Sequence, residues 1–343
     1  MNRKSIVVGL ALICVVILGT GPAAAAKAPS GTGTAVLLVS GLQGGSGSTV
    51  GPDGALYVTE RTAGRISRVD PRTGAVSTFA SGLPKELAAG GGFGGPVDVA
   101  FIGKTAYALV TLVGPDLGGN SVVGIYRIDG PNQFTVVADI GAFALRNPPP
   151  PIFKIDVPSG VQYALEVYRG GFLVTDGHHN RVLRVSLDGQ VTELIQFGDI
   201  VPTGLAVSGN TVYMAEAGPV PHRPQDGKVV AFRPGAHTAT QVASGAPLLV
   251  DVEFGRGHRL YALSQGTFSG GPEGSPALPN TGALVRANRH GGFTVVTGGL
   301  DRPTSLEFIG STAYVVTLTG EIWRIDDVGG PPHERGDDER DDD

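Results

Sequence analysis

A short strand-like segment recurs six times along the chain, and this repeat constrains the fold more than any other feature of the sequence. Each copy begins with a small or turn-forming residue and then alternates apolar with polar positions, the period of two that is typical of a half-buried β-strand. The six copies are GRISRVD at 64–70, GIYRID at 124–129, NRVLRVS at 180–186, GKVVAF at 227–232, GALVRAN at 282–288 and GEIWRID at 320–326. Six copies predict six structural units.

A second predicted strand precedes each of these segments, and five of its six copies carry a tyrosine at the same position. The aligned residues are Tyr57, Tyr107, Leu173, Tyr213, Tyr261 and Tyr314, at intervals of about 40 to 66 residues. Apolar runs on either side complete four predicted strands per unit, joined by turns rich in Gly, Pro, Asp and Asn. Since no helical pattern of about 10 to 15 residues separates the strands, βαβ units are excluded. The sequence therefore predicts an all-β fold, a six-bladed β-propeller of four-stranded blades.

The two ends of the repeat region complete each other. After the sixth copy the sequence runs into proline and acidic residues and offers no fourth strand, whereas AVLLVSGL at 35–42 precedes the first unit without a partner. We therefore expect this N-terminal strand to pair with the last blade and close the ring, which removes the exposed edges of an open array. An open solenoid is the alternative, and the complementary ends disfavour it.

The first residues predict export. Basic residues at positions 3 and 4 precede an apolar run at 6–18, and four alanines at 23–26 suit a signal peptidase, so we expect residues 1–26 to be a signal peptide. An uncleaved membrane anchor is the alternative, but the run is shorter than the roughly 20 residues that span a bilayer. Cys14 is the only cysteine and lacks the preceding small residue of a lipoprotein signal, so the mature chain would have no thiol chemistry.

The remaining chain divides into a propeller at 27–328 and an acidic tail at 329–343. Positions 337–343 hold six carboxylates and one arginine, a self-repelling run that predicts a solvated, disordered end, with a calcium-collecting or surface-binding tail as the alternative. The chain has a formal net charge of −5 and shows no basic stripe, which excludes nucleic-acid binding. We expect a secreted protein of the medium or cell envelope, without stable membrane insertion after cleavage.

Insertions between the predicted strands mark where a function would be added to the scaffold. They lie at 85–96, which is glycine-rich, and at 113–121, 142–158, 217–227 and 266–281. All leave the blades at comparable places, so they would crowd one or both openings of the central channel.

The densest polar group lies in the third unit, in the segment VTDGHHNRV at 174–182. Asp176, His178, His179 and Asn180 fall within one predicted turn, where the imidazoles would serve as base, metal ligand or hydrogen-bond donor near a carboxylate. The alternative is that Asp176 and Asn180 simply organise the turn.

Glu60 with Arg61, and Glu216, occupy the equivalent strand ends of the first and fourth units. Together with the turn in the third unit, we expect these residues to form a polar or metal-coordinating rim that binds a ligand. Asp176, His178 and Glu216 are the candidates for catalytic residues. The alternative is that Glu60 and Arg61 only pair with each other.

The predicted inner strands carry Asp98 and Asp251 at the same register. The remaining units have Ser48, Ala164, Gly204 and Ser305 at this position. Two carboxylates around a channel would hold a cation such as calcium through oxygen ligands. A water-filled channel that hydrates the two carboxylates is the alternative.

With these motifs in view, the sequence resembles the ScyD/ScyE family of secreted propellers and, more loosely, the NHL and regucalcin-like propellers. The resemblance covers nearly all of the predicted mature chain and rests on LLVSGLQGGSGSTVGPDGALYVTE at 37–60, VTDGHHNRVLRV at 174–185, and the blade starts PTGLAV and PTSLEF. It implies a propeller fold and export, and it brings no assigned reaction or catalytic residue.

The calcium-dependent lactonases of the regucalcin type resemble this chain in fold, and they hold their metal with acidic and amide side chains at the start of the inner strands. The corresponding positions in this chain are Gly47, Val97, Tyr163, Thr203, Val250 and Thr304. None of them is an acid or an amide, which argues against the lactonase mechanism.

The sequence therefore favours a binding or scaffold protein with a site for a small molecule, glycan or protein at the channel mouth. The alternative is a hydrolase or lyase of the regucalcin/gluconolactonase-like superfamily with its active site on the propeller axis. No GxSxG elbow, HExxH helix, P-loop or dinucleotide fingerprint occurs in the context it requires, so the sequence does not decide whether the protein is an enzyme. No cofactor is predicted, and calcium is the only candidate.

Overall fold

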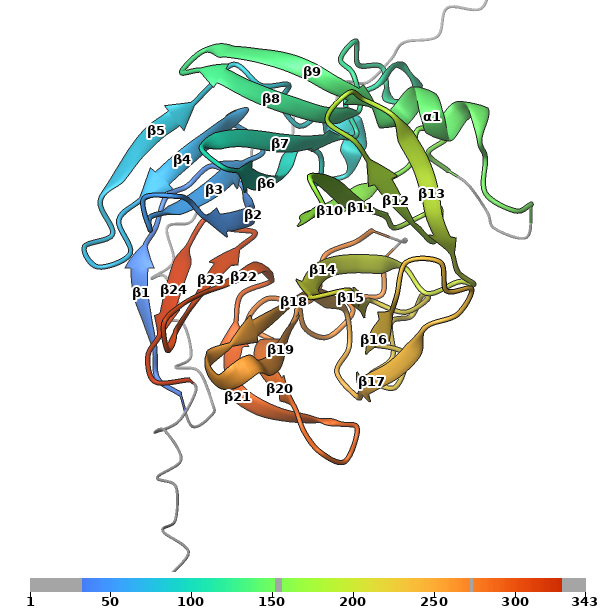
Figure 1. Ribbon diagram of the computed structural model, residues 1–343. Helices are drawn as coiled ribbons and strands as arrows, with labels where there is room; N and C mark the ends of the chain where they lie inside the picture. The colour runs from blue at the N-terminus through green and yellow to red at the C-terminus, as the bar shows by residue number, and fades with distance from the viewer. Residues whose placement is uncertain (1–32, 152–155, 272–273, 329–343) are drawn as a thin grey trace, which may run out of the picture.

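The computed structural model describes residues 33–151, 156–271 and 274–328, whose strands form six four-stranded antiparallel sheets around a central axis (Figure 1). This confirms the predicted six-bladed β-propeller. The predicted signal peptide at 1–26 and acidic tail at 329–343 lie outside the described residues.

In every blade the strands are ordered from an innermost strand beside the axis to an outermost strand at the rim. The strands of each blade are given below in this order. Blades 1 to 3 consist of β2 (Gly45–Val50), β3 (Leu56–Glu60), β4 (Arg65–Val69) and β5 (Val76–Ala80); β6 (Gly95–Ile102), β7 (Thr105–Thr111), β8 (Gly124–Gly130) and β9 (Gln133–Asp139); and β10 (Gln162–Tyr168), β11 (Gly171–Asp176), β12 (Arg181–Val185) and β13 (Val191–Gln196). Blades 4 to 6 consist of β14 (Pro202–Ser208), β15 (Thr211–Glu216), β16 (Lys228–Phe232) and β17 (Thr240–Ser244); β18 (Leu249–Gly255), β19 (Arg259–Ser264), β20 (Gly282–Ala287) and β21 (Phe293–Leu300); and β22 (Pro303–Ile309), β23 (Thr312–Thr317), β24 (Ile322–Ile325) and β1 (Ala35–Val39).

The outermost strand of blade 6 comes from the beginning of the chain. β1 runs antiparallel to β24, with Ala35 opposite Ile325 and Leu37 opposite Trp323. Figure 1 shows β1, in blue, beside the red β24. Ile325 is fully buried between this blade and its neighbour, so the pairing joins the two ends of the ring through a packed core as well as through backbone hydrogen bonds.

In four of the six blades the repeated tyrosine packs against an aromatic ring of the next blade. Tyr57 of blade 1 meets Phe101 of blade 2 with ring centroids 4.8 Å apart. The same contact recurs between Tyr107 and Phe172, Tyr213 and Phe254, and Tyr261 and Phe308, each at 4.9 Å. Edge and tilted aromatic pairs of this kind stabilise beyond their buried area. The tyrosine signal in the sequence is therefore a signal of blade-to-blade packing.

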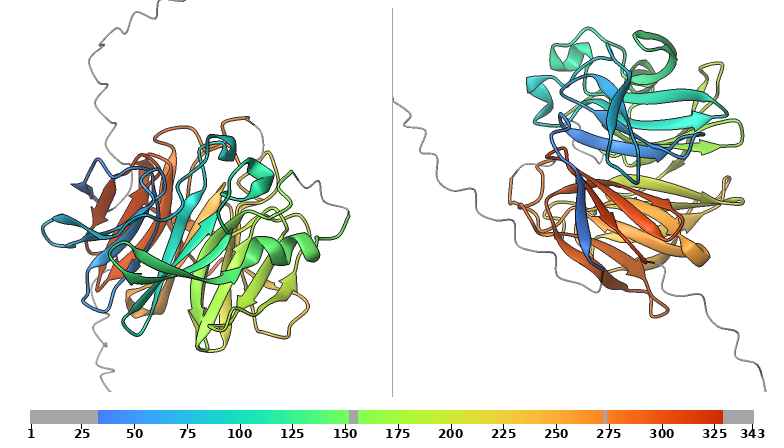
Figure 2. Two further views of the ribbon diagram at one scale, coloured as in Figure 1. Left: turned by 90° about the horizontal axis from the view of Figure 1, so that it is seen from above. Right: turned by 90° about the vertical axis from the view of Figure 1, so that its left-hand side faces the viewer.

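The five insertions all lie on one face of the ring. Each connects a second strand to a third strand, or an outermost strand to the next inner strand, and antiparallel strands bring both kinds of connection to the same face. Figure 2 shows this edge-on, with the longer loops gathered on one side. We call it the loop face, and we call the opposite face, which carries short turns, the hairpin face.

One of these insertions contains a helix that the sequence did not predict. α1 (Ile140–Arg146) follows β9 directly, and its N-cap Asp139 accepts a hydrogen bond from the amide of Ala142 at 2.7 Å. Its seven residues are too short to show an amphipathic period. The other helices are single 3₁₀ turns: η1 (Ala88–Gly90), η2 (Pro115–Leu117) and η3 (Arg256–His258). Within the described residues, no helix has the length and hydropathy of a membrane span.

Candidate functional site in the axial channel

The six inner strands surround a cavity of about 230 Å³ on the propeller axis. Side chains at every second residue of an inner strand face this space, because successive residues of a strand point to opposite sides. Each inner strand also shifts its register against the second strand of its blade near the loop face. Such β-bulges re-aim side chains, and in this ring they recur where the channel lining begins.

Near the loop face, one residue from each inner strand faces the axis, and we call these six residues the first ring. It contains Asp98 from blade 2 and Asp251 from blade 5. Its other members are Ser48, Ala164, Gly204 and Ser305, so the six positions aligned in the sequence surround the axis together. Blades 2 and 5 are three blades apart in a ring of six. The two carboxylates therefore face the channel from opposite sides.

Both aspartates are fixed by backbone amides. Asp98 accepts hydrogen bonds from Val99 at 2.8 Å and from Leu165 of blade 3 at 2.7 Å. Asp251 does the same with Val252 at 2.8 Å and with Leu306 of blade 6 at 2.7 Å. These bonds satisfy amides at the inner edge of the aspartate's own sheet and of the neighbouring sheet, which no further strand covers.

Two serines complete the polar part of this ring. The hydroxyl groups of Ser48 and Ser305 lie 2.9 Å apart, and the Ser48 amide donates to the Ser305 hydroxyl at 3.0 Å. A hydrogen bond from Ser305 also reaches Asp251. The serines therefore join blades 1 and 6, and they place hydroxyl groups beside one of the two aspartates.

A second ring, nearer the hairpin face, holds three glutamates that were not among the candidates from the sequence. Glu166, Glu253 and Glu307 line the same cavity, each two residues after a member of the first ring. The period of two was the signal that would have found them, because a residue two positions beyond Asp251 faces the same side of its strand. The cavity is therefore lined by five carboxylates.

Burial raises the pKa of all five carboxyl groups, and repulsion between them adds to the shift in most cases. The pKa of Asp251 rises to about 7 through burial, and that of Glu253 rises to about 8 through burial and the nearby charge of Asp251. The pKa values of Asp98, Glu166 and Glu307 lie well above their usual range for the same two reasons. No Lys, Arg or His is among the described residues that line this cavity.

The sequence left two hypotheses for Asp98 and Asp251, a calcium centre and a water-filled channel that hydrates them, and the two carboxylates alone do not supply a calcium coordination sphere. Among the described residues, no three His, Cys, Asp or Glu side chains come together closely enough to hold a metal ion. Calcium takes six to eight oxygen ligands, and two carboxylates on opposite blades do not assemble them.

At the loop face, an aromatic stack closes the channel. Phe93, from the glycine-rich insertion, stacks on Tyr163 of β10 with ring centroids 5.4 Å and planes 14° apart. The guanidinium of Arg61 lies 5.9 Å from the Phe93 ring, and its Nη1 donates to Glu86 and to the Gly92 carbonyl, both at 2.7 Å. Arg61 is only 3% exposed and its Nε has no partner within the described residues, so a buried cation stands at this end of the channel.

A second, smaller cavity of about 20 Å³ lies below this stack. Tyr163 lines it together with both aspartates, Thr304 and Ser305. Burial and the charges of Asp251 and Asp98 raise the pKa of the Tyr163 phenol, which keeps it neutral. The floor of the channel therefore offers a neutral hydroxyl group next to two carboxylates.

The strand ends predicted to form a rim do not meet at the axis. Glu60 is fully buried within blade 1, where it accepts from Arg65 Nε at 2.7 Å, from Ser67, and from the Gln43 amide at 2.6 Å. Burial alone would raise its pKa, but these hydrogen bonds outweigh burial and lower it. Glu60 and Arg61 do not pair with each other, since Arg61 binds Glu86 instead.

The polar turn of blade 3 forms a buried ionic cluster of its own. Arg181 Nε lies 3.1 Å and His179 Nδ1 lies 3.0 Å from the same oxygen of Asp176, and all three side chains are fully buried. Asn180 accepts hydrogen bonds from the amides of Ile200 and Val201, which supports its expected role as a turn organiser. The neighbouring His178 is half-buried. None of these side chains lines the axial cavities.

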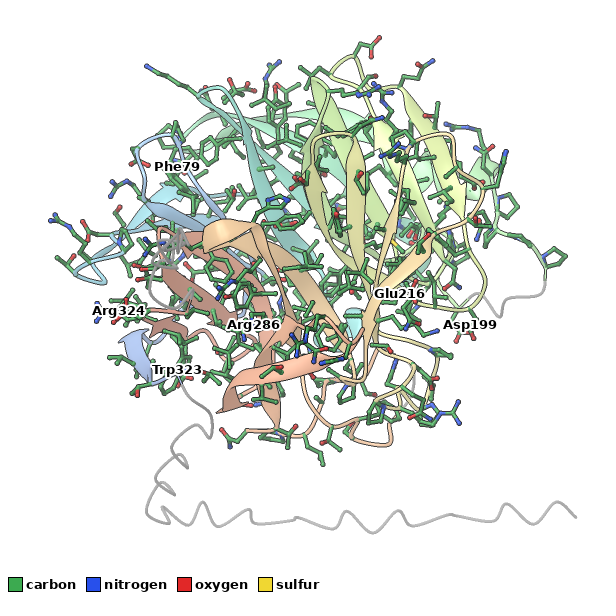
Figure 3. All side chains as sticks on the ribbon, turned by 60° about the horizontal axis from the view of Figure 1, so that its bottom comes forward. Phe79, Asp199, Glu216, Arg286, Trp323 and Arg324 are labelled. Carbon is green, nitrogen blue, oxygen red and sulfur yellow. The ribbon has the colours of Figure 1, made fainter. Side chains whose placement is uncertain are left out.

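Glu216, at the end of β15, is 5% exposed and lies opposite Lys228 on β16. Burial raises its pKa to about 7, and the charge of Lys228 only partly opposes this shift. Figure 3 shows Glu216 closer to the middle of the molecule than the exposed Asp199. Glu216, like Glu60 and Asp176, lines neither of the axial cavities.

Comparisons with known proteins bear on the fold. No protein-family model matches the sequence, and no curated protein matches it. A gluconolactonase from Xanthomonas campestris is similar in structure, with 14% identity, a TM-score of 0.59, and coverage of 88% of this chain and 95% of that one. The PQQ-bound aldose sugar dehydrogenase of Streptomyces coelicolor shares 14% identity, with a TM-score of 0.57 and coverage of 87% and 99%.

A virginiamycin B lyase from Staphylococcus aureus also matches, with 14% identity, a TM-score of 0.52, and coverage of 86% of this chain and 98% of that one. These neighbours share the β-propeller fold with this chain, and the six-bladed β-propeller is the class that the fold defines. At these identities the likeness establishes the fold alone.

Proposed function

We propose that the protein binds a small positively charged molecule inside the axial channel. The observation that carries the proposal is that five carboxylates share one cavity while no basic side chain lines it within the described residues. Buried carboxylates repel each other and lack solvation, which is why their pKa values are raised. A bound cation relieves both penalties, so the channel is electrostatically complementary to a cation.

The ligand would enter from the hairpin face. At the loop face, Phe93, Tyr163 and the cationic Arg61 stand across the axis. At the other end, the glutamate ring faces the larger cavity. The aromatic stack therefore obstructs the loop-face end, where Arg61 is paired with Glu86, whereas the glutamates attract a cation at the other end.

A second candidate is an enzyme that uses the channel carboxylates as general acid and base. Asp251 and Glu253 support it, since pKa values of about 7 and about 8 suit proton transfer near neutral pH. The fold also occurs in a gluconolactonase and in virginiamycin B lyase, which are a hydrolase and a lyase by name. The reaction class would then be hydrolysis or elimination on a small molecule.

We also propose that the protein is exported. The apolar run and alanines at 1–26 would direct the protein to the medium or cell envelope, and the sequence resemblance would place it with the ScyD/ScyE propellers. There the loop face, with its five insertions, would remain available to a glycan or protein partner.

Isothermal titration of the purified protein at pH 7.5 tests the proposal, with alkylamines, arginine and calcium as ligands. We expect saturable binding of at least one organic cation, weakened more than tenfold by the double substitution Glu253→Gln and Glu307→Gln. Asp199→Asn removes an exposed carboxylate and is the matched control, expected to bind as the unmodified protein does. Binding that survives the double substitution would contradict the proposal.

Turnover separates the two candidates. The same preparations are incubated with lactones, esters and cyclic depsipeptides, and products are followed by mass spectrometry. Product formation that disappears in Asp251→Asn would establish the enzyme, whereas cation binding without turnover of any substrate would support the binding protein.

A further inference from the structure

We infer that the ligand of the axial channel is a linear aliphatic diamine, with one primary ammonium group seated between Asp98 and Asp251 and the other at the ring of Glu166, Glu253 and Glu307. This inference rests on the proposed function, because it names the chemical class of the cation. It follows from the size of the small cavity, its acceptors, and the spacing of the two acidic rings.

The small cavity at the channel floor sets the size of the group it accepts. Its volume of about 20 Å³ holds a single water-sized group, since one water needs roughly 10 to 15 Å³ of this kind of space. A primary ammonium is of that size. Guanidinium and trimethylammonium groups are several times larger and would have to displace the inner strands.

The acceptors around this cavity match the three N–H donors of a primary ammonium. Each oxygen of Asp98 and of Asp251 accepts one backbone hydrogen bond, and an ionised carboxylate offers about four acceptor sites, so both side chains keep free lone pairs. The third acceptor is the hydroxyl of Tyr163, which makes no hydrogen bond within the described residues and lines the same cavity. The aspartates are held in place by backbone amides, so binding needs little reorganisation.

A metal ion would not find its ligands at this floor. Calcium takes six to eight oxygens and magnesium a near-octahedral set. Among the described residues, no such group of acidic side chains comes together. An ammonium is satisfied by two or three directed hydrogen bonds, which the opposed aspartates and the tyrosine provide.

The second ring fixes the position of the second charge. Glu253 follows Asp251 by two residues on β18, and Glu307 follows Ser305 by two residues on β22. Two residues of a strand rise by about 6.6 Å, so the two rings are separated along the axis by roughly the length of a four-carbon chain with an amine at each end. The larger cavity of about 230 Å³ accommodates that chain.

Titration with four compounds tests the inference: 1,4-diaminobutane, butylamine, the N-permethylated diamine and calcium. We expect 1,4-diaminobutane to bind about tenfold or more tightly than butylamine, because a second charge-assisted contact is gained. The permethylated diamine and calcium should bind at least tenfold more weakly than the diamine.

Variants distinguish the two ends of the channel. Tyr163→Phe keeps the aromatic ring and removes the hydroxyl, and it should weaken the diamine and butylamine by the same factor, about three- to tenfold. Glu253→Gln should weaken the diamine alone and leave butylamine within about threefold. Asp199→Asn should change neither. Circular dichroism and the melting temperature establish that each variant is folded.

The possible failures point to different conclusions. If the permethylated diamine or calcium binds as tightly as 1,4-diaminobutane, or if Tyr163→Phe and Glu253→Gln leave both amines unaffected, the inference is overturned while the proposed cation site stands. If none of the cations binds, the proposed function itself falls.

Discussion

Asp98 and Asp251 face each other across the propeller axis and make the same two hydrogen bonds. Each accepts from the amide that follows it in its own strand and from a leucine amide in the next blade, Leu165 for one and Leu306 for the other. Each aspartate therefore links two blades and also contributes a carboxylate to the channel. Changes in the channel should consequently affect stability as well as binding, in directions that the structure predicts.

The protein should become less stable as the pH rises from about 5 to about 8. The folded-state pKa values of Asp251 and Glu253, about 7 and about 8, lie above the ordinary values of 3.8 and 4.5. In this window the unfolded chain has released protons that the folded chain still holds, so the free energy of unfolding falls with increasing pH. Glu60, with its lowered pKa, acts in the opposite sense only below about pH 4.5.

Thermal unfolding at pH 5.5 and pH 8 measures this effect. We expect a melting temperature several degrees lower at pH 8, which corresponds to a loss on the order of a few kcal/mol. A melting temperature that rises over this interval would show that the carboxylates of the folded channel titrate normally.

Glu307→Gln should stabilise the protein at pH 8. Glu307 makes no hydrogen bond within the described residues, and the charges of Glu253 and Asp251 add to the burial that raises its pKa. An amide of the same shape removes the repulsion and the cost of burying a charge, which is worth about 1 to 3 kcal/mol. Urea denaturation at pH 8 and at pH 5 checks this, since the gain should shrink at pH 5, close to the ordinary pKa of 4.5, where the raised pKa of Glu307 costs little stability. Equal stability of variant and unmodified protein at pH 8 would count against the mutual repulsion.

Gly204→Ala should be strongly destabilising. A Cβ atom at Gly204 would lie 2.5 Å from Cα and 2.6 Å from Oδ1 of Asp251, so the inner strands of blades 4 and 5 would have to move apart. We expect a cost of about 1 to 3 kcal/mol, as for other overpacked sites. Gly198→Ala is the matched control, because a Cβ atom there meets nothing within 4 Å. Comparable unfolding midpoints for the two variants would refute this close approach.

Arg181→Ala should be among the most damaging single substitutions in blade 3. Arg181 is fully buried, bonds to Asp176, and donates to the Asn147 carbonyl at 2.8 Å. Its removal leaves a buried carboxylate without its cation, at a cost of about 3 to 5 kcal/mol. Arg181→Lys should recover only part of this loss, because one ammonium does not replace the planar guanidinium fork. Chemical denaturation measures both, and the exposed Arg72→Ala serves as control.

Most of the architecture could be predicted from the sequence. The six strand repeats, the tyrosine positions and the shared register of Asp98 and Asp251 all depend on local periodicity, and the structure has them as expected. The helix at 140–146 was missed because a helix of about two turns has no detectable period. The glutamate ring was also within reach, since Glu253 is only one strand period beyond Asp251.

The amino-acid sequence by itself determined the number of blades, the order of strands within each, and which residues share a register, because these follow from alternation and repetition along the chain. Only the tertiary structure decided that Glu60 and Glu216 lie away from the axial cavities, and that Phe93 stacks on Tyr163 at the loop-face end of the channel. These relationships depend on how far each strand end lies from the ring axis and where a glycine-rich loop comes to rest. Both are set by the packing of whole blades against one another, which no local pattern encodes.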